Sequence, residues 1–271
     1  MDRAQELGKE IMSVLLAAAF LFLKTGEKFA TQETAEPTVA ELTAYVGDKA
    51  GTKFEPTVMN DPIKAAEFCG AKKPAAGVVT PGFYLQYAKA LQMEPLLETK
   101  RTGVKEERYV LVVRKDAPDD LAKLAGKTIA TPLANEQRYV MAVILRGKLG
   151  DEIRLKQASD VENAVFDLVE NAKSAADAVL METGAWALFK DDPELGSKLK
   201  VVYESEELPR DLVVLFGPKN DALNSDKLKA ALKEMTGNDA GKKILSSIQV
   251  DAFVDIHQPR LSQAQSLFYG K

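Results

Sequence analysis

The amino-acid sequence predicts an α/β fold with mostly parallel sheets. Short runs of β-branched and other apolar residues alternate along the chain with segments whose apolar residues recur every three or four positions. The chain has 271 residues, of which 46% are hydrophobic and 28% charged, as expected of a globular protein large enough for two domains. Strands that alternate with helices favour parallel sheets covered by those helices.

In the first half of the chain, helical segments have an apolar face and a recognisable start. Val39, Leu42 and Val46 share one face of a helix, and Asp61-Pro62 is a typical helix start. Between the helices lie apolar runs of strand length. The expected elements are helices at 38–46, 63–68, 83–91 and 119–124, and strands at 75–79, 108–114 and 127–131.

The second half of the chain repeats this alternation. Helices are expected at 141–149, 161–172 and 228–235, and strands at 176–181, 199–203 and 211–216. No Gly-Ser-rich or Pro-rich linker divides the sequence. Two domains would therefore be joined by ordered strands.

The apolar stretch from Ile11 to Leu23 fits two interpretations. It contains only Ser13 as a polar residue, has the length of the apolar region of a signal peptide, and is too short to span a membrane. However, acidic residues outnumber basic ones before it, and the best small-residue triplet for cleavage lies inside the apolar run. The alternative is a buried first strand at 18–23, which these flanks favour.

Composition and motifs exclude several classes of protein. Lys and Arg total 36 against 40 Asp and Glu, so a net charge of −4 gives no general affinity for nucleic acid. Cys69 is the single cysteine and His257 the single histidine, which leaves no intrachain disulfide and no Cys- or His-based metal cluster. The sequence has no P-loop, no dinucleotide-binding glycine motif and no nucleophile elbow. We therefore expect no enzyme activity, no cofactor and no metal.

Two segments of the chain resemble a known family. Residues 108–133 read RYVLVVRKDAPDDLAKLAGKTIATPL, and residues 174–219 contain a strand, a loop and a helix followed by DPELGSKLKVVYES and PRD. Together with DAFV at 251–254, their order resembles that of the phosphate/phosphonate-type solute-binding proteins of ABC transporters. These proteins belong to the type II periplasmic binding protein superfamily. The resemblance covers roughly Thr80 to Val254.

This resemblance implies a two-lobed α/β fold with a ligand cleft between the lobes. Lobe one would consist of residues 1–116 and 208–271, and lobe two of the inserted residues 117–207. The strands at 108–114 and 211–216 would cross between the lobes and serve as the hinge on which they close around a ligand.

The loops that follow the strands supply the candidate binding residues, because ligands of such folds bind beyond the carboxyl ends of strands. In the first loop, Thr80 offers a hydroxyl, Gly82 permits close backbone approach and Tyr84 offers an aromatic wall. An ordinary turn that caps a helix would explain the same three residues.

Two further loops lie in the expected second lobe. One reads TPLANEQRY where the family has a Ser-x-Ser-Gly anion cradle, and its candidates are Thr131, Asn135 and Arg138. Arg138 either bonds to an anionic ligand or is solvated on its helix. The other loop offers Glu182 and Thr183. Glu182 either accepts hydrogen bonds from an amine or hydroxyl of the ligand or stabilises the first turn of a helix.

The resemblance implies a solute-binding receptor of an ABC transporter. It would bind a small polar or anionic solute, such as a phosphate- or phosphonate-like oxyanion, and deliver it to a permease. We expect a monomer in the periplasm or elsewhere outside the cytoplasm, with a signal peptide that is absent or upstream of Met1. The alternatives are a degenerate or sensory binding-protein-like domain with another ligand or a protein partner, and, with less support, an enzyme on the same scaffold.

Overall fold

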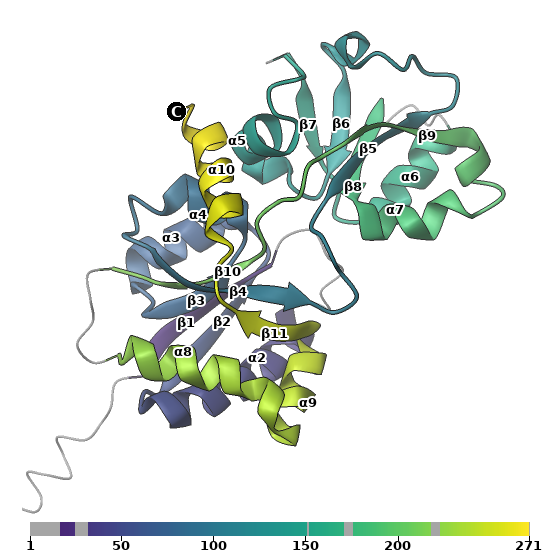
Figure 1. Cartoon of the computed structure of the whole chain (residues 1–271). Helices are drawn as coiled ribbons and strands as arrows, with labels where there is room; N and C mark the ends of the chain where they lie inside the picture. Colours follow the sequence, from purple (N-terminus) through teal and green to yellow (C-terminus); the bar gives the residue numbers. More distant parts are fainter. Residues whose placement is uncertain (1–16, 25–31, 151, 171–175, 218–222, 271) are drawn as a thin grey trace, which may run out of the picture.

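Two β-sheets with their helices form two lobes, and the chain passes between them twice (Figure 1). A computed structural model describes residues 17–24, 32–150, 152–170, 176–217 and 223–270. The crossing segments are residues 102–108 and 205–211, which lie between strands of different sheets. They are hydrogen-bonded to each other, since the Leu208 N–H donates to the Glu107 carbonyl at 2.8 Å. Both passages therefore run side by side.

Lobe one is built on a sheet of six strands in the order β11-β4-β10-β3-β1-β2. Its strands are β1 (Ala18–Leu23), β2 (Phe54–Met59), β3 (Ala76–Val79), β4 (Glu94–Arg101), β10 (Leu212–Leu215) and β11 (Val250–Val254). Its helices are α2 (Gln32–Ala50), α3 (Pro62–Lys72), α4 (Pro81–Tyr87), α8 (Ser225–Glu234), α9 (Asp239–Ser247) and α10 (Gln258–Tyr269). A 3-10 turn, η5 (Met235–Gly237), joins α8 to α9.

Lobe two is built on a sheet of five strands in the order β7-β6-β8-β5-β9. Its strands are β5 (Tyr109–Arg114), β6 (Thr128–Thr131), β7 (Arg154–Gln157), β8 (Ala178–Glu182) and β9 (Leu199–Glu204). Its helices are α5 (Gln137–Tyr139), α6 (Val161–Glu170) and α7 (Thr183–Lys190). Shorter turns are η1 (Leu121–Leu124), η2 (Ala134–Glu136), the π-helical η3 (Val140–Ile144) and η4 (Gly196–Lys198).

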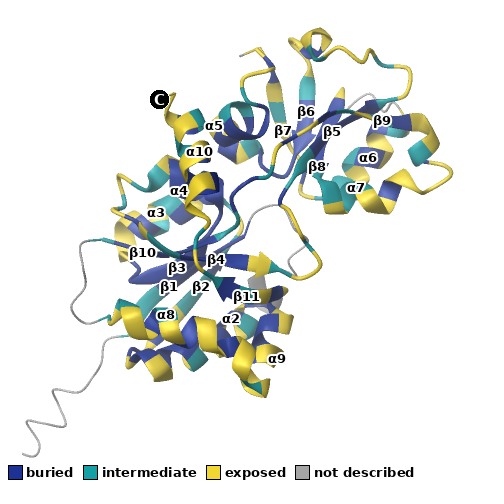
Figure 2. Ribbon diagram, in the orientation of Figure 1, coloured by how far each residue is buried: buried dark blue, intermediate teal, exposed yellow. Residues whose placement is uncertain are grey.

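Alternate residues of the central strands pack into different hydrophobic cores, which places helices on both faces of each sheet (Figure 2). In β1, Phe20 and Phe22 contribute to the core beneath α2, α8 and α9. Leu21 and Leu23 contribute to a second core, which also contains residues of α3, α4, α10 and lobe two. A continuous apolar core therefore extends from one lobe into the other.

Both sheets are mixed, and most strands of each sheet run in the same direction, as expected. The pairs β1–β2, β1–β3, β6–β7 and β6–β8 are parallel. Each strand that arrives from the other lobe runs against its neighbours: β10 is antiparallel to β3 and β4, and β5 is antiparallel to β8 and β9. The two passages between the lobes thus account for much of the mixed pattern.

The strand expected at 108–114 lies in lobe two, although the sequence analysis includes it in lobe one, up to residue 116. It is β5, and it pairs with β8 and β9. The sheets therefore divide the chain within 102–108 and within 205–211. Each of the strands β5 and β10 begins where the chain enters a lobe, directly after a crossing segment.

The strand interpretation of the N-terminal apolar stretch is confirmed at Ala18–Leu23, where β1 pairs with β2 and β3. Residues 11–16 of that stretch lie outside the described residues. The helix expected at 141–149 is instead the π-helical turn η3, which directly follows α5. Among the described residues, no helix combines the length and apolar character needed to cross a membrane.

Candidate functional site

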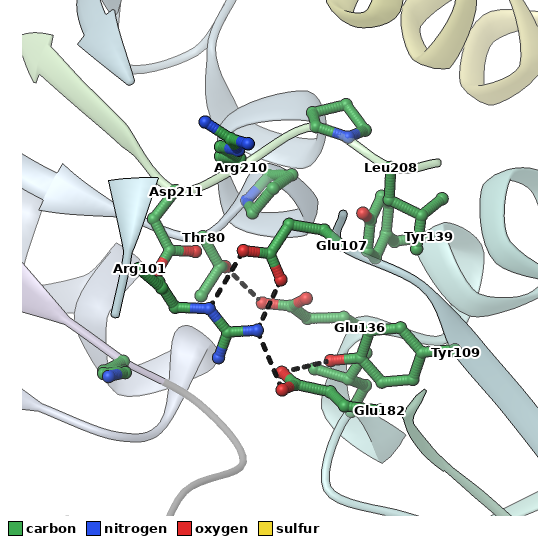
Figure 3. Close-up of a pocket in the computed structure, with 14 residues that line it drawn as sticks. Thr80, Arg101, Glu107, Tyr109, Glu136, Tyr139, Glu182, Leu208, Arg210 and Asp211 are labelled. Carbon is green, nitrogen blue, oxygen red and sulfur yellow. Dashed lines mark hydrogen bonds and ion pairs between the residues drawn. The ribbon is translucent and has the colours of Figure 1, made fainter. Parts of the chain in front are cut away.

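A cavity of about 50 Å³ lies between the lobes, at the ends of strands from both sheets (Figure 3). Lys24 follows β1, Thr80 follows β3, and Glu182 ends β8. The crossing segments contribute Glu107 and the run from Leu208 to Asp211. The cavity therefore combines residues of both lobes and both connections, at the strand ends where ligands of α/β folds bind.

Thr80 connects the first lobe to a glutamate of the second. Its hydroxyl oxygen accepts from the Phe83 N–H at 3.2 Å and so caps the start of α4. The same hydroxyl donates to Oε1 of Glu136 at 2.6 Å. Thr80 and Glu136 are both buried. This hydrogen bond consequently joins the lobes across the cavity.

Glu136 is a buried carboxyl group with a single hydrogen-bond partner among the described residues. Its Oε2 atom is buried and accepts no hydrogen bond from them. It lies against Gly82, where a Cβ atom would come within 2.2 Å of Oε2, so a side chain at this position would displace the carboxyl. Burial raises the pKa of Glu136; the Thr80 hydrogen bond opposes this effect and the nearby charge of Asp211 adds to it, and the result is a pKa of about 7.

Arg101 joins two other carboxylates of the cavity lining (Figure 3). Its Nε donates to Glu107 Oε1 at 3.0 Å, and its Nη2 donates to Glu107 Oε2 and, at 2.8 Å, to Glu182 Oε2. The Tyr109 hydroxyl donates to Glu182 Oε1 at 3.3 Å. Burial, followed by the charge of Glu182, raises the pKa of Tyr109 well above its ordinary value. Tyr109 therefore remains a hydrogen-bond donor.

The charges around the cavity nearly balance. Its lining holds the four acidic residues Glu107, Glu136, Glu182 and Asp211 and the three basic residues Lys24, Arg101 and Arg210. With all seven ionised the sum is −1, and with Glu136 protonated it is zero. Within the part of the chain that the structure describes, no group of three or more His, Cys, Asp or Glu residues is placed to hold a metal ion.

Arg210 has donor capacity that remains unused. Its Nη2 donates to the Lys105 carbonyl at 3.0 Å, and its Nη1 lies 3.8 Å from Glu98 Oε1. Its Nε is buried and has no hydrogen-bond partner among the described residues. A buried guanidinium N–H without a partner is costly, and an acceptor on a solute would remove that cost.

Of the eight residues predicted to bind a ligand, Thr80 and Glu182 line the cavity, and Gly82 touches the Glu136 carboxyl behind it. Tyr84 is buried with its hydroxyl toward Gln265 and Tyr269 of α10. Arg138 also faces α10, where its Nε donates to the Phe268 carbonyl at 3.0 Å. The start of α5 thus directs Arg138 away from the cavity.

The remaining predicted residues also lie outside the cavity lining. Thr131 is fully buried, and its hydroxyl accepts from the Leu133 N–H at 3.3 Å. Asn135 is exposed. The Thr183 N–H donates to the Arg108 carbonyl at 2.9 Å. A role of these three in binding stays a prediction that their positions do not support.

Five residues of the cavity lining are not among those predicted from the sequence: Arg101, Glu107, Tyr109, Glu136 and Arg210. One sequence feature could have identified Glu136 as a cavity residue: it lies in the loop where the related family has serines. Another could have identified Arg210, which belongs to the PRD segment that carries the resemblance. Arg101 ends a strand whose sequence, EPLLETKR, is too polar to be predicted as one.

Comparisons with known proteins agree with this architecture. In three dimensions the chain is similar to XAC2383 from Xanthomonas citri bound to ATP, with a TM-score of 0.73, 14% identity, and coverage of 94% of this chain and 97% of that one. It is also similar to a protein from Prochlorococcus marinus in complex with methylphosphonate, with a TM-score of 0.66, 13% identity and coverage of 94% and 97%. At these identities the likeness concerns the fold, which is that of two-lobed type II periplasmic binding proteins.

A third similar structure is a binding protein component of an ABC phosphonate transporter from Pseudomonas aeruginosa, with a TM-score of 0.65, 15% identity and coverage of 93% and 85%. No curated protein matches the sequence. Residues 28–260 match the ABC transporter phosphonate periplasmic substrate-binding protein family. The chain therefore belongs to the periplasmic substrate-binding proteins of phosphonate ABC transporters.

Proposed function

We propose that this chain binds one small oxyanion-bearing solute in the cavity between its lobes and presents it to an ABC transporter permease outside the cytoplasm. It acts as a monomeric receptor without catalysis. The observation that carries this proposal is the cavity itself, which gathers charged groups from both lobes and both crossing segments. Because both lobes contribute, a bound solute stabilises their closed arrangement.

The volume of the cavity favours a very small solute. About 10–15 Å³ accommodates one water molecule, so the roughly 50 Å³ available here corresponds to about four. One similar structure holds methylphosphonate and another ATP. Of these two, a molecule of the size of methylphosphonate matches the cavity, whereas a nucleotide requires a wider opening between the lobes.

The side chains around the cavity suit a solute with both an acidic and a donating group. Arg210, which lines the cavity, supplies a charged donor for an oxyanion. Glu107 and Glu182, which also line the cavity, can accept hydrogen bonds from an amine or hydroxyl group. Glu182 has this role in the sequence-based hypothesis as well.

One observation favours a second candidate function. Arg101 already bonds with Glu107 and Glu182, and Glu136 bonds with Thr80. Many polar groups of the lining therefore have hydrogen-bond partners within the protein. A degenerate family member that binds a protein partner instead of a solute would have such a cavity. A protein of this second kind would bind no small solute, and this property distinguishes it from the first candidate.

The test is a solute panel of phosphate, methylphosphonate, aminomethylphosphonate, methanesulfonate and ATP. Melting temperatures report binding, and calorimetry gives the Kd. We expect at least one small oxyanion to raise the melting temperature by mass action, with ATP ineffective. If none of the five raises it, the degenerate scaffold becomes the better account.

A matched pair of arginine variants locates the site. Arg210→Met removes a charged donor at the cavity, and we expect it to weaken the bound oxyanion by about tenfold or more. Arg114→Met removes an arginine that pairs with Asp116 on lobe two, and it should leave the Kd unchanged. Equal affinities for the two variants would place the solute elsewhere.

A further inference from the structure

The four carboxyl groups around the cavity differ in how their charge is compensated. Arg101 bonds to both Glu107 and Glu182. Asp211 directly precedes β10 and follows Arg210 in the sequence. Glu136 has one neutral partner, the Thr80 hydroxyl, and a buried oxygen atom for which the described residues provide no donor.

Among the described residues, no cation bonds directly to Glu136. Tyr139 from α5 and Thr80 are neutral, and Asp211 adds a negative charge. The strand β7 and helix α3 also pack against η2, but their charged side chains are exposed to solvent. Lys24, Arg101 and Arg210 share the cavity, but none of the three donates a hydrogen bond to Glu136.

We propose that Glu136 determines which solutes the cavity accepts, because an anionic group enters only when this carboxyl is uncharged. Solute binding is then coupled to one proton on Glu136. The inference rests on the proposed function, which places an oxyanion in the same cavity.

Simple electrostatics supports this coupling. A charged Glu136 gives the lining a net charge of −1 and repels an incoming anion at short range, where little water screens the interaction. A protonated Glu136 leaves a neutral lining and removes this repulsion. Burial raises the pKa of Glu136 to about 7, so both forms are populated near neutral pH.

The experiment compares methylphosphonate binding to the wild type and to Glu136→Gln by calorimetry from pH 5.5 to 8.5. The proton equilibrium of methylphosphonate itself is the same for both proteins and cancels in the ratio of their Kd values. We expect a constant ratio below about pH 6 and a rise of about tenfold for each pH unit above 7, as the wild type alone loses affinity. Glu194→Gln, which changes an exposed glutamate of lobe two, should behave as the wild type.

Each result decides the inference. Equal pH dependence for the wild type and Glu136→Gln overturns it. Absence of methylphosphonate binding to both proteins at every pH also overturns it, because Glu136→Gln removes the proposed barrier. The solute panel then decides separately whether the proposed function stands. If Glu136→Gln does not fold, Glu136→Met provides an uncharged side chain of similar length and the same expected ratio.

Discussion

Two buried glutamates, Glu98 and Glu136, lie in surroundings of opposite character. Glu98 in β4 is 4% exposed, and Glu136 in η2 is 8% exposed. Glu98 accepts from the Arg260 guanidinium at 2.7 Å and from the His257 backbone N–H at 3.1 Å, with Arg210 at 3.8 Å. Glu136 accepts from the Thr80 hydroxyl and from no other group of the described residues.

The two glutamates therefore have different roles: Glu98 holds parts of the structure together, whereas Glu136 belongs to the cavity. Arg260 of α10 also bonds to Glu207 in the second crossing segment, so the Glu98 cluster attaches both the C-terminal helix and the hinge to lobe one. A buried charge is tolerated where cations and N–H groups surround it. Where they do not, as at Glu136, the carboxyl retains its proton to a higher pH.

The largest expected effect follows from breaking the Glu98 cluster. Arg260→Ala leaves Glu98 and Glu207 without their main cation, and we expect a loss of about 3–5 kcal/mol in the free energy of unfolding. Urea denaturation measures it. Lys242→Ala, which removes an exposed lysine 4.0 Å from Asp239, is the control and should have no measurable effect. A loss below 1 kcal/mol for Arg260→Ala would show that the Glu98 cluster does not hold the C-terminal helix and the crossing segment to lobe one.

The second effect is a pH dependence of stability that belongs to Glu136. Its pKa is about 7 in the folded chain against an ordinary 4.5, so its protonation stabilises the fold fully below pH 4.5. That contribution is lost as the pH rises through 7, and the loss is about 3 kcal/mol at most. The difference between the unfolding free energies of wild type and Glu136→Gln, followed from pH 4 to 8, should show this fall. Parallel curves would contradict it.

Removing the single partner of Glu136 should have a smaller effect. Thr80→Val deletes the cap of α4 and the donor to Glu136, and we expect a loss of about 1–2 kcal/mol in unfolding free energy. Asn224→Ala deletes the cap of α8 without touching a buried acid, and it should cost only about 1 kcal/mol. A double-mutant cycle of Thr80→Val with Glu136→Gln isolates the bond between the lobes, and a coupling of zero would contradict it.

The smallest effect concerns Arg138, an exposed cation that contacts α10 as the buried Arg260 does. Its guanidinium lies 4.7 Å from the centre of the Phe268 ring. Arg138→Ala should lower the unfolding free energy by at most about 1 kcal/mol and leave the Kd of any bound oxyanion unchanged. A tenfold weaker Kd would restore Arg138 to the binding site that the sequence analysis assigns to it.

The sequence predicts what depends on local pattern. The α/β class, the first strand at Ala18–Leu23 and the cap at Thr80 follow from periodicity and turn residues. The bond between Thr80 and Glu136 spans 56 positions, and that between Arg101 and Glu182 spans 81. Such pairs depend on how the lobes meet, which periodicity does not encode.

The antiparallel direction of β5 and β10 and the orientation of the Arg138 side chain cannot be predicted from the sequence, and the reason is the same for both. The mixed sheets arise because β5 and β10 enter from the opposite lobe, a feature of the chain path rather than of either strand sequence. Arg138 lies in the expected loop, but the short α5 and the π-helical turn after it rotate its side chain toward α10. The resemblance thus points to a loop that lines the cavity, but not to Glu136, the residue of its η2 turn that does so.

The most direct test of the central claim is an NMR titration of the Glu136 side-chain carboxyl carbon in the ligand-free protein. Comparison with Glu136→Gln assigns the signal. The structure predicts a midpoint near pH 7, because this carboxyl is buried beside Asp211 with one hydroxyl as its partner. A midpoint near the ordinary pH 4.5 would show that Glu136 is charged in the cavity, and would contradict its role in admitting the solute.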